Sequence, residues 1–223
     1  MVMLTPRGLK IGTIIDKTLG VIEHNIAPAL IYLVAMTAVS SAIKYFSIGK
    51  TAPLDLLAIV LIGVAVGVVG AYALLDAMVR RTGLREQSHG DAFLPFVGLS
   101  LLTTLGIALG FLAVVIPGLV IMARWSIAAP MLLVRGGGVM KALGDSWERT
   151  SGAEFQYLVA VFALLLPLIA VMIVCGVMFE QADLVGIAIS QLASAGLTVL
   201  TSAMGVAMYG LIVGSEEEAA AFA

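Results

Sequence analysis

Charged side chains are scarce in this chain, and their scarcity excludes an ordinary soluble domain. Only 12% of its 223 residues are Asp, Glu, Lys or Arg, whereas 61% are hydrophobic, and the mean hydropathy is +1.12. Soluble domains are about 25% charged and about 45–50% apolar. Because so few charged side chains cannot cover the outside of a folded chain, most of its surface must face lipid. The net charge of −2 gives no reason to expect a nucleic-acid partner.

Cysteine and catalytic motifs are also almost absent. Cys175 is the single cysteine, which excludes a disulfide within the chain. The sequence has no phosphate-binding loop, dinucleotide fingerprint, metalloprotease helix motif or serine nucleophile elbow. We therefore predict a protein that is not an enzyme, with no catalytic residues, no metal ion and no cofactor. His24 and His89 stand near acidic residues but without close ligand spacing, so surface histidines are a simpler interpretation than a shared metal site.

What the chain does contain is six long apolar stretches. A membrane-spanning helix needs about 20 mostly apolar residues, because the hydrocarbon core is about 30 Å thick. The stretches that qualify, or nearly do, are residues 25–46, 53–79, 92–115, 118–134, 155–179 and 184–213. They predict an all-α, polytopic integral membrane protein with about six transmembrane helices in a single domain over residues 1–223.

The apolar run over residues 92–134 is about twice as long as one crossing, so it must turn. Pro117 and Gly118 are the obvious turn residues, because proline ends hydrogen-bonded helix and glycine accepts unusual backbone dihedrals. We therefore predict a hairpin turn at Pro117-Gly118, at the far membrane surface.

Lysine and arginine predict the orientation, since they accumulate on the cytoplasmic side of a membrane. If the six spans alternate, only Lys44 and Lys50 lie on one side, and Arg124 lies within the fourth span. The other nine basic residues share the opposite side: Arg7, Lys10, Lys17, Arg80, Arg81, Arg85, Arg135, Lys141 and Arg149. Both termini are therefore expected in the cytoplasm.

Two further segments, residues 8–23 and 137–151, have the pattern of amphipathic helices. Each has apolar residues near helical spacing on one face and charged residues on another. This pattern is typical of helices in the headgroup region of a membrane, where basic residues meet anionic lipid. It is equally typical of connecting helices that pack on a bundle.

Arg124 lies in an apolar stretch, six residues past the predicted turn and therefore about 9 Å along a helix. A charge at that depth costs about 2.5–3.5 kcal/mol or more, so it needs partners inside the bundle. One is the Ser126 carbonyl, which a helix kink at Pro130 would leave free. Another is Asp76, although this acid also has Arg80 at helical spacing. A structural role, a substrate-binding role and a side chain that extends to the far surface all remain open.

Small and hydroxyl residues recur at four-residue spacing in three of the spans. They are Gly63 with Gly67, Gly106 with Gly110, and the series Ser190, Ser194, Thr198 and Ser202. Such residues let helices approach closely and hydrogen-bond across the contact. Packing within the chain is the simplest interpretation, and a solute path or a contact with another subunit are the alternatives.

The stretch from Pro117 to Gly152 resembles a known family. It is similar to the membrane domain that accompanies some bacterial glycerophosphoryl diester phosphodiesterases and also occurs alone. The matching elements are Pro117-Gly118, Arg124-Trp125, Pro130, and the signature Ser146, Trp147, Thr150 and Gly152. The opening Leu9–Gly20 is also similar, whereas Arg135 stands where the family usually has Glu. The catalytic barrel of those enzymes is missing, so the resemblance implies a bacterial inner-membrane protein without that activity or its metal.

These observations favour a non-enzymatic inner-membrane scaffold or accessory subunit of a membrane assembly. Its expected partners are membrane lipids, with other membrane subunits or a second copy as further candidates. The alternative is a small permease or lipid-handling transporter that uses Arg124 for an anionic group. A water-accessible cleft that reaches Arg124 would favour the alternative.

Overall fold

The computed structural model describes residues 9–84, 92–178 and 183–214, and these residues form helices without any strand. The helices are α1 (Ile11–His24), α2 (Ile26–Ser47), α3 (Pro53–Arg81), α4 (Phe93–Ala113), α5 (Val115–Arg124), α6 (Ala128–Arg135), α7 (Val139–Arg149), α8 (Glu154–Met178) and α9 (Leu184–Tyr209), which continues as a π-helical turn over Gly210–Gly214. Six stretches of this part of the chain are long and apolar enough to cross a membrane. The prediction of an all-α chain with six such stretches is confirmed.

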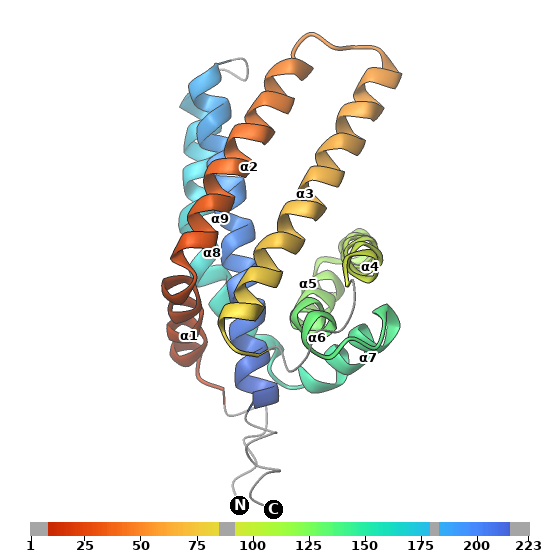
Figure 1. The fold of residues 1–223 in the computed structure, drawn as a ribbon, viewed down its shortest axis with the longest axis vertical. Helices are drawn as coiled ribbons and strands as arrows, with labels where there is room; N and C mark the ends of the chain where they lie inside the picture. Colours follow the sequence, from red (N-terminus) through yellow and green to blue (C-terminus); the bar gives the residue numbers. More distant parts are fainter. Residues whose placement is uncertain (1–8, 85–91, 179–182, 215–223) are drawn as a thin grey trace, which may run out of the picture.

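Four of these helices, α2, α3, α8 and α9, run along the long axis of the molecule (Figure 1). The turn between α2 and α3 lies at one end of this upright bundle, together with the end of α8 and the start of α9. Helix α1, the end of α3 and the π-helical turn after α9 lie at the opposite end. We call this second end the basal end.

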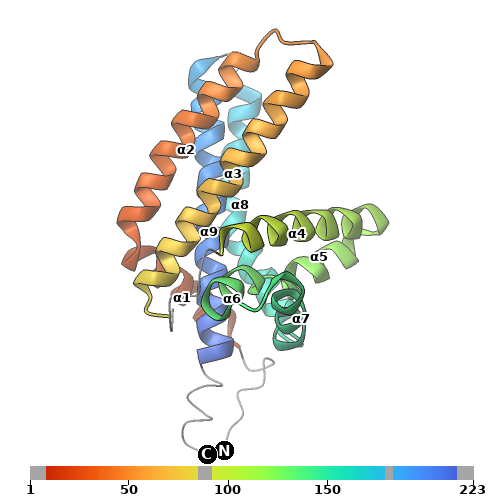
Figure 2. The ribbon, with the colours of Figure 1, turned by 45° about the vertical axis from the view of Figure 1, so that its right-hand side comes forward.

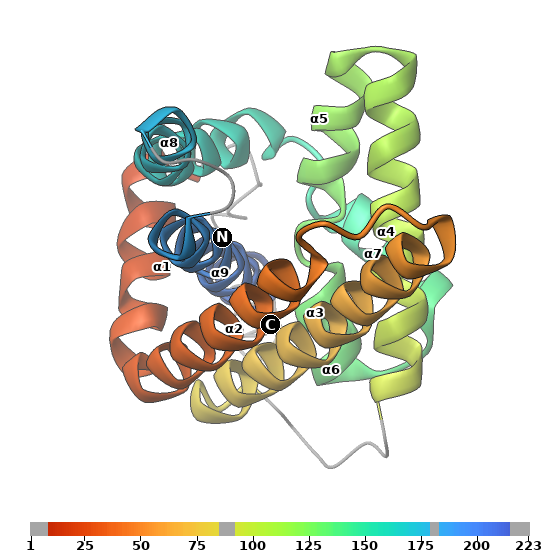
Figure 3. The ribbon, with the colours of Figure 1, turned by 90° about the horizontal axis from the view of Figure 1, so that it is seen from above.

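Helices α4 and α5 form a hairpin that runs across the bundle. Helix α4 is seen end-on in Figure 1 but lengthwise in Figure 2, where α2 and α3 rise steeply beside it. The view from above shows α4 and α5 side by side, extending away from the upright helices (Figure 3). The candidate spans therefore fall into two groups with different directions.

The hairpin turns at Val114, so the predicted turn at Pro117-Gly118 is wrong. Val114 is extended, with φ −164° and ψ 151°, and α5 begins at the next residue. Pro117 lies in the first turn of α5, where a missing N–H costs nothing because it would have no intrahelical partner. Gly118 has another role: a Cβ there would lie 2.8 Å from the backbone nitrogen of Phe111, and Gly110 on α4 faces the Gly118 backbone. Both glycines permit the close approach of the two helices.

The stretch predicted as a fourth span is two short helices rather than one kinked helix. Helix α5 ends at Arg124, Trp125–Ile127 form a turn, and α6 begins at Ala128. Pro130 therefore follows the break and lies in the first turn of α6, where its missing N–H is again tolerated. The predicted kink at Pro130 is therefore wrong, because the helix breaks at Trp125–Ile127, before the proline.

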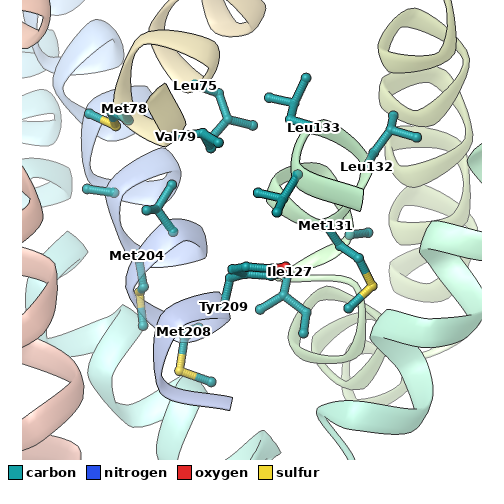
Figure 4. Packing of buried hydrophobic residues seen from close by; sticks show 14 of the residues in the cluster. Leu75, Met78, Val79, Ile127, Met131, Leu132, Leu133, Met204, Met208 and Tyr209 are labelled. Carbon is teal, nitrogen blue, oxygen red and sulfur yellow. The ribbon is translucent and has the colours of Figure 1, made fainter. Parts of the chain in front are cut away.

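The hydrophobic core lies at the basal end, where α6 packs against both α3 and α9 (Figure 4). Met78 from α3, Met131 from α6 and Met208 from α9 are almost completely buried. Toward the opposite end the apolar side chains are open to the surroundings, and Leu54 of α3 is 80% exposed. The chain thus has a soluble-like core at one end only, while its upper part has the apolar exterior of a protein in lipid.

The two predicted amphipathic segments are helical and both pack on the bundle. Helix α1 buries Ile14 and Thr18 against its neighbours and contacts α8 and α9. Helix α7 buries Ala142 and Leu143 and contacts α4, α5 and α6. Both also lie at or near the basal end, in agreement with Figure 1.

Candidate functional site

The candidate site is centred on Arg124, the last residue of α5. Its Nη1 donates a hydrogen bond to the carbonyl oxygen of Trp147 at 2.9 Å, and its Nη2 pairs with Oε1 of Glu154 at 2.6 Å. Only 18% of the Arg124 side chain and 23% of the Glu154 side chain are exposed. Because both charges are largely withdrawn from solvent, removal of either leaves the other uncompensated.

Glu154 begins α8, and the backbone before it holds its carboxylate. Gly152 has φ +90°, and its N–H donates to Oε2 of Glu154 at 2.8 Å. A carboxylate in the first turn of a helix is also favoured by the unpaired N–H groups and the helix dipole. One carboxylate oxygen is therefore held by the backbone, and the other faces Arg124.

The backbone carbonyl of Arg124 is held by α7. The Ser146 hydroxyl donates to it at 2.7 Å, and the Thr150 hydroxyl shares its one proton between this oxygen at 2.9 Å and the Ser146 carbonyl at 2.7 Å. Carbonyls in the last turn of a helix lack an intrahelical partner, so these hydroxyls satisfy an acceptor that the end of α5 leaves open. The two residues are one helical turn apart on α7 and are 0% and 2% exposed. Their spacing allows both to reach the same oxygen.

Two tryptophans complete the site. The guanidinium carbon of Arg124 lies 5.2 Å from the centroid of the Trp147 ring, a cation–π distance. The rings of Trp125 and Trp147 meet edge to face, with centroids 6.4 Å apart. On its other side, Trp125 packs directly against Gly106 of α4, where any Cβ would overlap the ring. The aromatic contacts thus connect the crosswise hairpin to α7.

These residues form one unit, which we call the Arg124 cluster: Arg124, Trp125, Ser146, Trp147, Thr150 and Glu154. The cluster fastens the end of α5 to α7 and to the start of α8. The Nε of Arg124 is enclosed by protein and has no hydrogen-bond partner, while both terminal nitrogens have partners within the chain. The arrangement therefore suits a structural junction better than the binding of a solute.

Of the two partners that the sequence offered for Asp76, the structure has Arg80 and not Arg124. Asp76 accepts from Nε of Arg80 at 2.6 Å, one helical turn away on α3. This outcome has a geometric reason. A straight helix from Pro117 would carry Arg124 into the membrane from the far surface, whereas the crosswise hairpin returns it to the start of α8, at the level of α7.

Ser126 likewise does not supply the predicted carbonyl partner. A Cβ on Gly205 of α9 would lie 3.1 Å from the Ser126 carbonyl oxygen, so this oxygen faces the α9 backbone. The carbonyl that Arg124 reaches is that of Trp147, on a helix later in the chain.

The small-residue motifs have different surroundings. Gly106 and Gly110 are in tight contact with Trp125 and Gly118, whereas a Cβ on Gly63 or Gly67 would meet nothing within 4 Å. Gly106 and Gly110 therefore serve packing of the hairpin, whereas Gly63 and Gly67 have no packing role among the described residues.

The hydroxyl series on α9 is largely tied to its own helix. Ser190 donates to the Ile187 carbonyl at 2.8 Å, and Thr198 donates to the Ser194 carbonyl at 3.3 Å. Thr198 also hydrogen-bonds Tyr32 of α2, and Ser202 is half-buried. Helices α2 and α9 pack closely together, which agrees with a packing role for this face.

No group of three His, Cys, Asp or Glu side chains within residues 9–84, 92–178 and 183–214 is placed to hold a metal ion. His24, at the end of α1, lies 3.1 Å through its Nε2 from the carbonyl oxygen of Arg81. His89 lies outside the described residues. His24 thus connects α1 to the end of α3.

Glu154 is the functional residue that sequence reasoning missed. It directly precedes the predicted fifth span, so a search for acids within the spans passed over it and selected Asp76. A signal was present, because an acid at the first position of a long apolar helix, two residues after a glycine, is a typical helix start.

Comparison with known proteins gives no relative from which a role could be transferred: no family model matches the chain, and no curated protein or solved structure is significantly similar to it.

Proposed function

We propose that this protein is a non-enzymatic membrane scaffold or accessory subunit whose basal end interacts with membrane lipids. The observation that carries the proposal is the engagement of Arg124. A permease that uses this residue for an anionic group needs a guanidinium open to water. Here the guanidinium is paired with Glu154, hydrogen-bonded to the Trp147 carbonyl, and only 18% exposed.

We further infer a revised membrane topology, with four crossings by α2, α3, α8 and α9. Helices α5 and α6 have 10 and 8 residues, which correspond to about 15 and 12 Å, too short for a 30 Å hydrocarbon core. The direction of α4 and α5 across the bundle supports the same inference (Figure 2). In this proposal the hairpin enters the membrane from the basal side, runs crosswise to the upright helices, and does not reach the far surface.

The basal end is proposed to be cytoplasmic. The described basic residues that the sequence assigns to one side remain on the basal side in a four-crossing chain, and Lys44 and Lys50 remain on the other; the first group is Lys10, Lys17, Arg80, Arg81, Arg135, Lys141 and Arg149. Arg124 now joins the basal group, because its partner Glu154 begins α8. The positive-inside rule therefore supports cytoplasmic termini more strongly with four crossings than with six.

The bacterial inner membrane is the proposed location. It rests on the resemblance to the membrane domain of glycerophosphoryl diester phosphodiesterases, whose shared residues Arg124, Ser146, Trp147 and Thr150 belong to the Arg124 cluster. A signature that joins helices is compatible with a domain that serves as an anchor or accessory part rather than as a catalyst.

Ligand-dependent melting of the purified protein tests this function against the permease alternative. Parent and Arg124→Lys are heated in mild detergent with a panel of small organic anions or with added phospholipid, and partner proteins that co-purify are identified by mass spectrometry. We expect phospholipid or a co-purified subunit to stabilise the parent, because a ligand that binds the folded state raises its melting temperature. A water-soluble anion that stabilises the parent with increasing concentration, and stabilises the Lys variant much less, would instead favour the permease.

A further inference from the structure

An apolar groove lies between the crosswise hairpin and α7. It has a volume of about 500 Å³, and its lining includes Leu105 and Leu109 of α4, Trp125, and Met140, Gly144 and Trp147 of α7. All of these residues are apolar, aromatic or glycine. The groove is thus bounded on one side by leucines of the hairpin and on the other by the apolar face of α7.

We propose that this groove binds one acyl chain of a phospholipid from the leaflet that holds the hairpin. The proposal rests on the proposed function, since it gives the lipid interaction of the basal end a defined site. It identifies the recognised chemistry as a long hydrocarbon chain rather than a headgroup.

The size of the groove favours a slender occupant. Its volume is within the range of small-molecule sites, about 300–1,000 Å³. One turn of an α-helix with its side chains also occupies about 500 Å³, from a diameter of about 10–12 Å and a pitch of 5.4 Å. The groove therefore accommodates about one turn of a partner helix, which is too little for a stable helix–helix contact, whereas a hydrocarbon chain can lie along it.

The surroundings of the groove also match a lipid. Leu105 and Leu109 are 58% and 56% exposed, so the groove opens onto an apolar face that a membrane hairpin presents to lipid tails. Met140 at the α7 side is 75% exposed and Trp147 is 42% exposed. Tryptophan is favoured at the boundary between tails and headgroups. A chain could thus pass from the lipid phase along α4 to Trp147 without crossing a polar surface.

The charges on α7 argue for recognition of the chain and against recognition of one headgroup. Lys141 and Arg149 are balanced on the same helix by Asp145 and Glu148. Anionic and zwitterionic phospholipids are therefore expected to occupy the groove to a similar extent. Chain length should matter more, because each buried methylene contributes to binding.

Gly144 offers a way to fill the groove without disturbing the protein. A Cβ at this position would meet nothing within 4 Å, and leucine has a higher helix propensity than glycine. Gly144→Leu is therefore expected to melt at or above the temperature of the parent while its side chain occupies the groove. The matched control is Gly12→Leu on the other amphipathic helix, where a Cβ also meets nothing within 4 Å.

The test is photo-crosslinking in vesicles of phosphatidylethanolamine and phosphatidylglycerol that contain a phosphatidylcholine with a diazirine near the end of one acyl chain. Crosslinked peptides are mapped by mass spectrometry. We expect labelling to concentrate on α4 and α7 residues of the groove in the parent and in Gly12→Leu. In Gly144→Leu it should fall about tenfold, the loss expected when two buried methylenes lose their contacts.

Three results would overturn the proposal. Labelling spread evenly over α3 and α4 and unchanged in Gly144→Leu would mean bulk lipid only. Labelling of the groove by a diazirine fatty acid but not by the phospholipid would exclude the phospholipid source. A groove that stays unlabelled in the parent while the exposed apolar faces of α3 and α4 are labelled would mean that a protein rather than a phospholipid occupies it. None of these results depends on the permease test, so failure of the groove and failure of the proposed function can be told apart.

Discussion

The upright bundle and the crosswise hairpin are built from equally apolar helices, yet they are held in place differently. In the bundle, α9 packs along α1, α2 and α8 and buries a continuous run of side chains, including Met204 and Met208. In the hairpin, α4 and α5 contact each other through Gly110 and Gly118 and are joined to the remainder by the Arg124 cluster.

In the proposed four-crossing topology, apolar length alone does not determine a crossing. The 21 residues of α4 are sufficient to span a membrane, but the hydrogen bonds and the ion pair of Arg124 hold the hairpin end at the start of α8. Polar side-chain contacts between different helices are few among the described residues, and where a bilayer excludes water each one has a large influence on geometry.

The largest expected effect is from removal of the Arg124 charge. Arg124→Met leaves Glu154 and the Trp147 carbonyl without a partner, which typically costs about 3–5 kcal/mol. Arg124→Lys should be intermediate, since lysine keeps the charge but lacks the planar fork. Thermal unfolding in detergent, with and without anionic lipid, measures both variants.

The result must be the same with and without lipid if the residue is structural. The opposite result would be an Arg124→Met protein that is as stable as the parent without lipid but gains no stability when lipid is added. It would mean that the guanidinium holds a lipid headgroup.

A second expected effect separates the glycines of the hairpin from those of the bundle. Gly118→Leu should destabilise by about 1–3 kcal/mol or more, because its side chain would overlap Phe111 and the α4 backbone. Gly63→Leu is the matched control in α3, where the same side chain meets open space. Equal melting temperatures for the two variants would contradict the close crossing of α4 and α5.

A smaller effect is expected from the hydroxyls of α7. Thr150→Val keeps the shape of the side chain but removes a buried hydroxyl shared between the Arg124 carbonyl at 2.9 Å and the Ser146 carbonyl at 2.7 Å, at a cost of about 1 kcal/mol. Thr201→Val on α9 is the control, because Thr201 is exposed and donates within its own helix. Thr150→Val should have the lower melting temperature of the two. A lower melting temperature for Thr201→Val would contradict a stabilising role of the Thr150 hydroxyl in the cluster.

The sequence predicts the helical stretches well because their signal is local. Apolar runs of 18 or more residues and the amphipathic patterns of residues 8–23 and 137–151 each depend only on neighbouring residues. The location of the hairpin turn depends instead on a tertiary contact. Pro117 and Gly118 have the composition of a turn, but Gly118 is needed for close approach to Phe111 and Gly110, and the chain reverses one turn earlier at Val114.

The candidate site was only partly predictable for the same reason. The need of Arg124 for buried partners follows from its surroundings in the sequence, and Ser146, Trp147 and Thr150 were identified by resemblance. Their meeting at Arg124 depends on the direction of the hairpin, as does the choice of Glu154 over Asp76. Local patterns contain no information on that direction.

The most direct test of the crosswise hairpin is cysteine labelling at its tip. Cys175 is replaced by alanine, and single cysteines are introduced at Lys50, Val114 and Glu148, which represent the far surface, the hairpin tip and α7. Intact cells are then treated with a membrane-impermeant maleimide. We predict that Lys50→Cys reacts, whereas Val114→Cys and Glu148→Cys stay unlabelled, and that permeabilisation exposes Glu148→Cys alone. Labelling of Val114→Cys in intact cells, at a rate like that of Lys50→Cys, would show that the hairpin crosses the membrane and would contradict the four-crossing account.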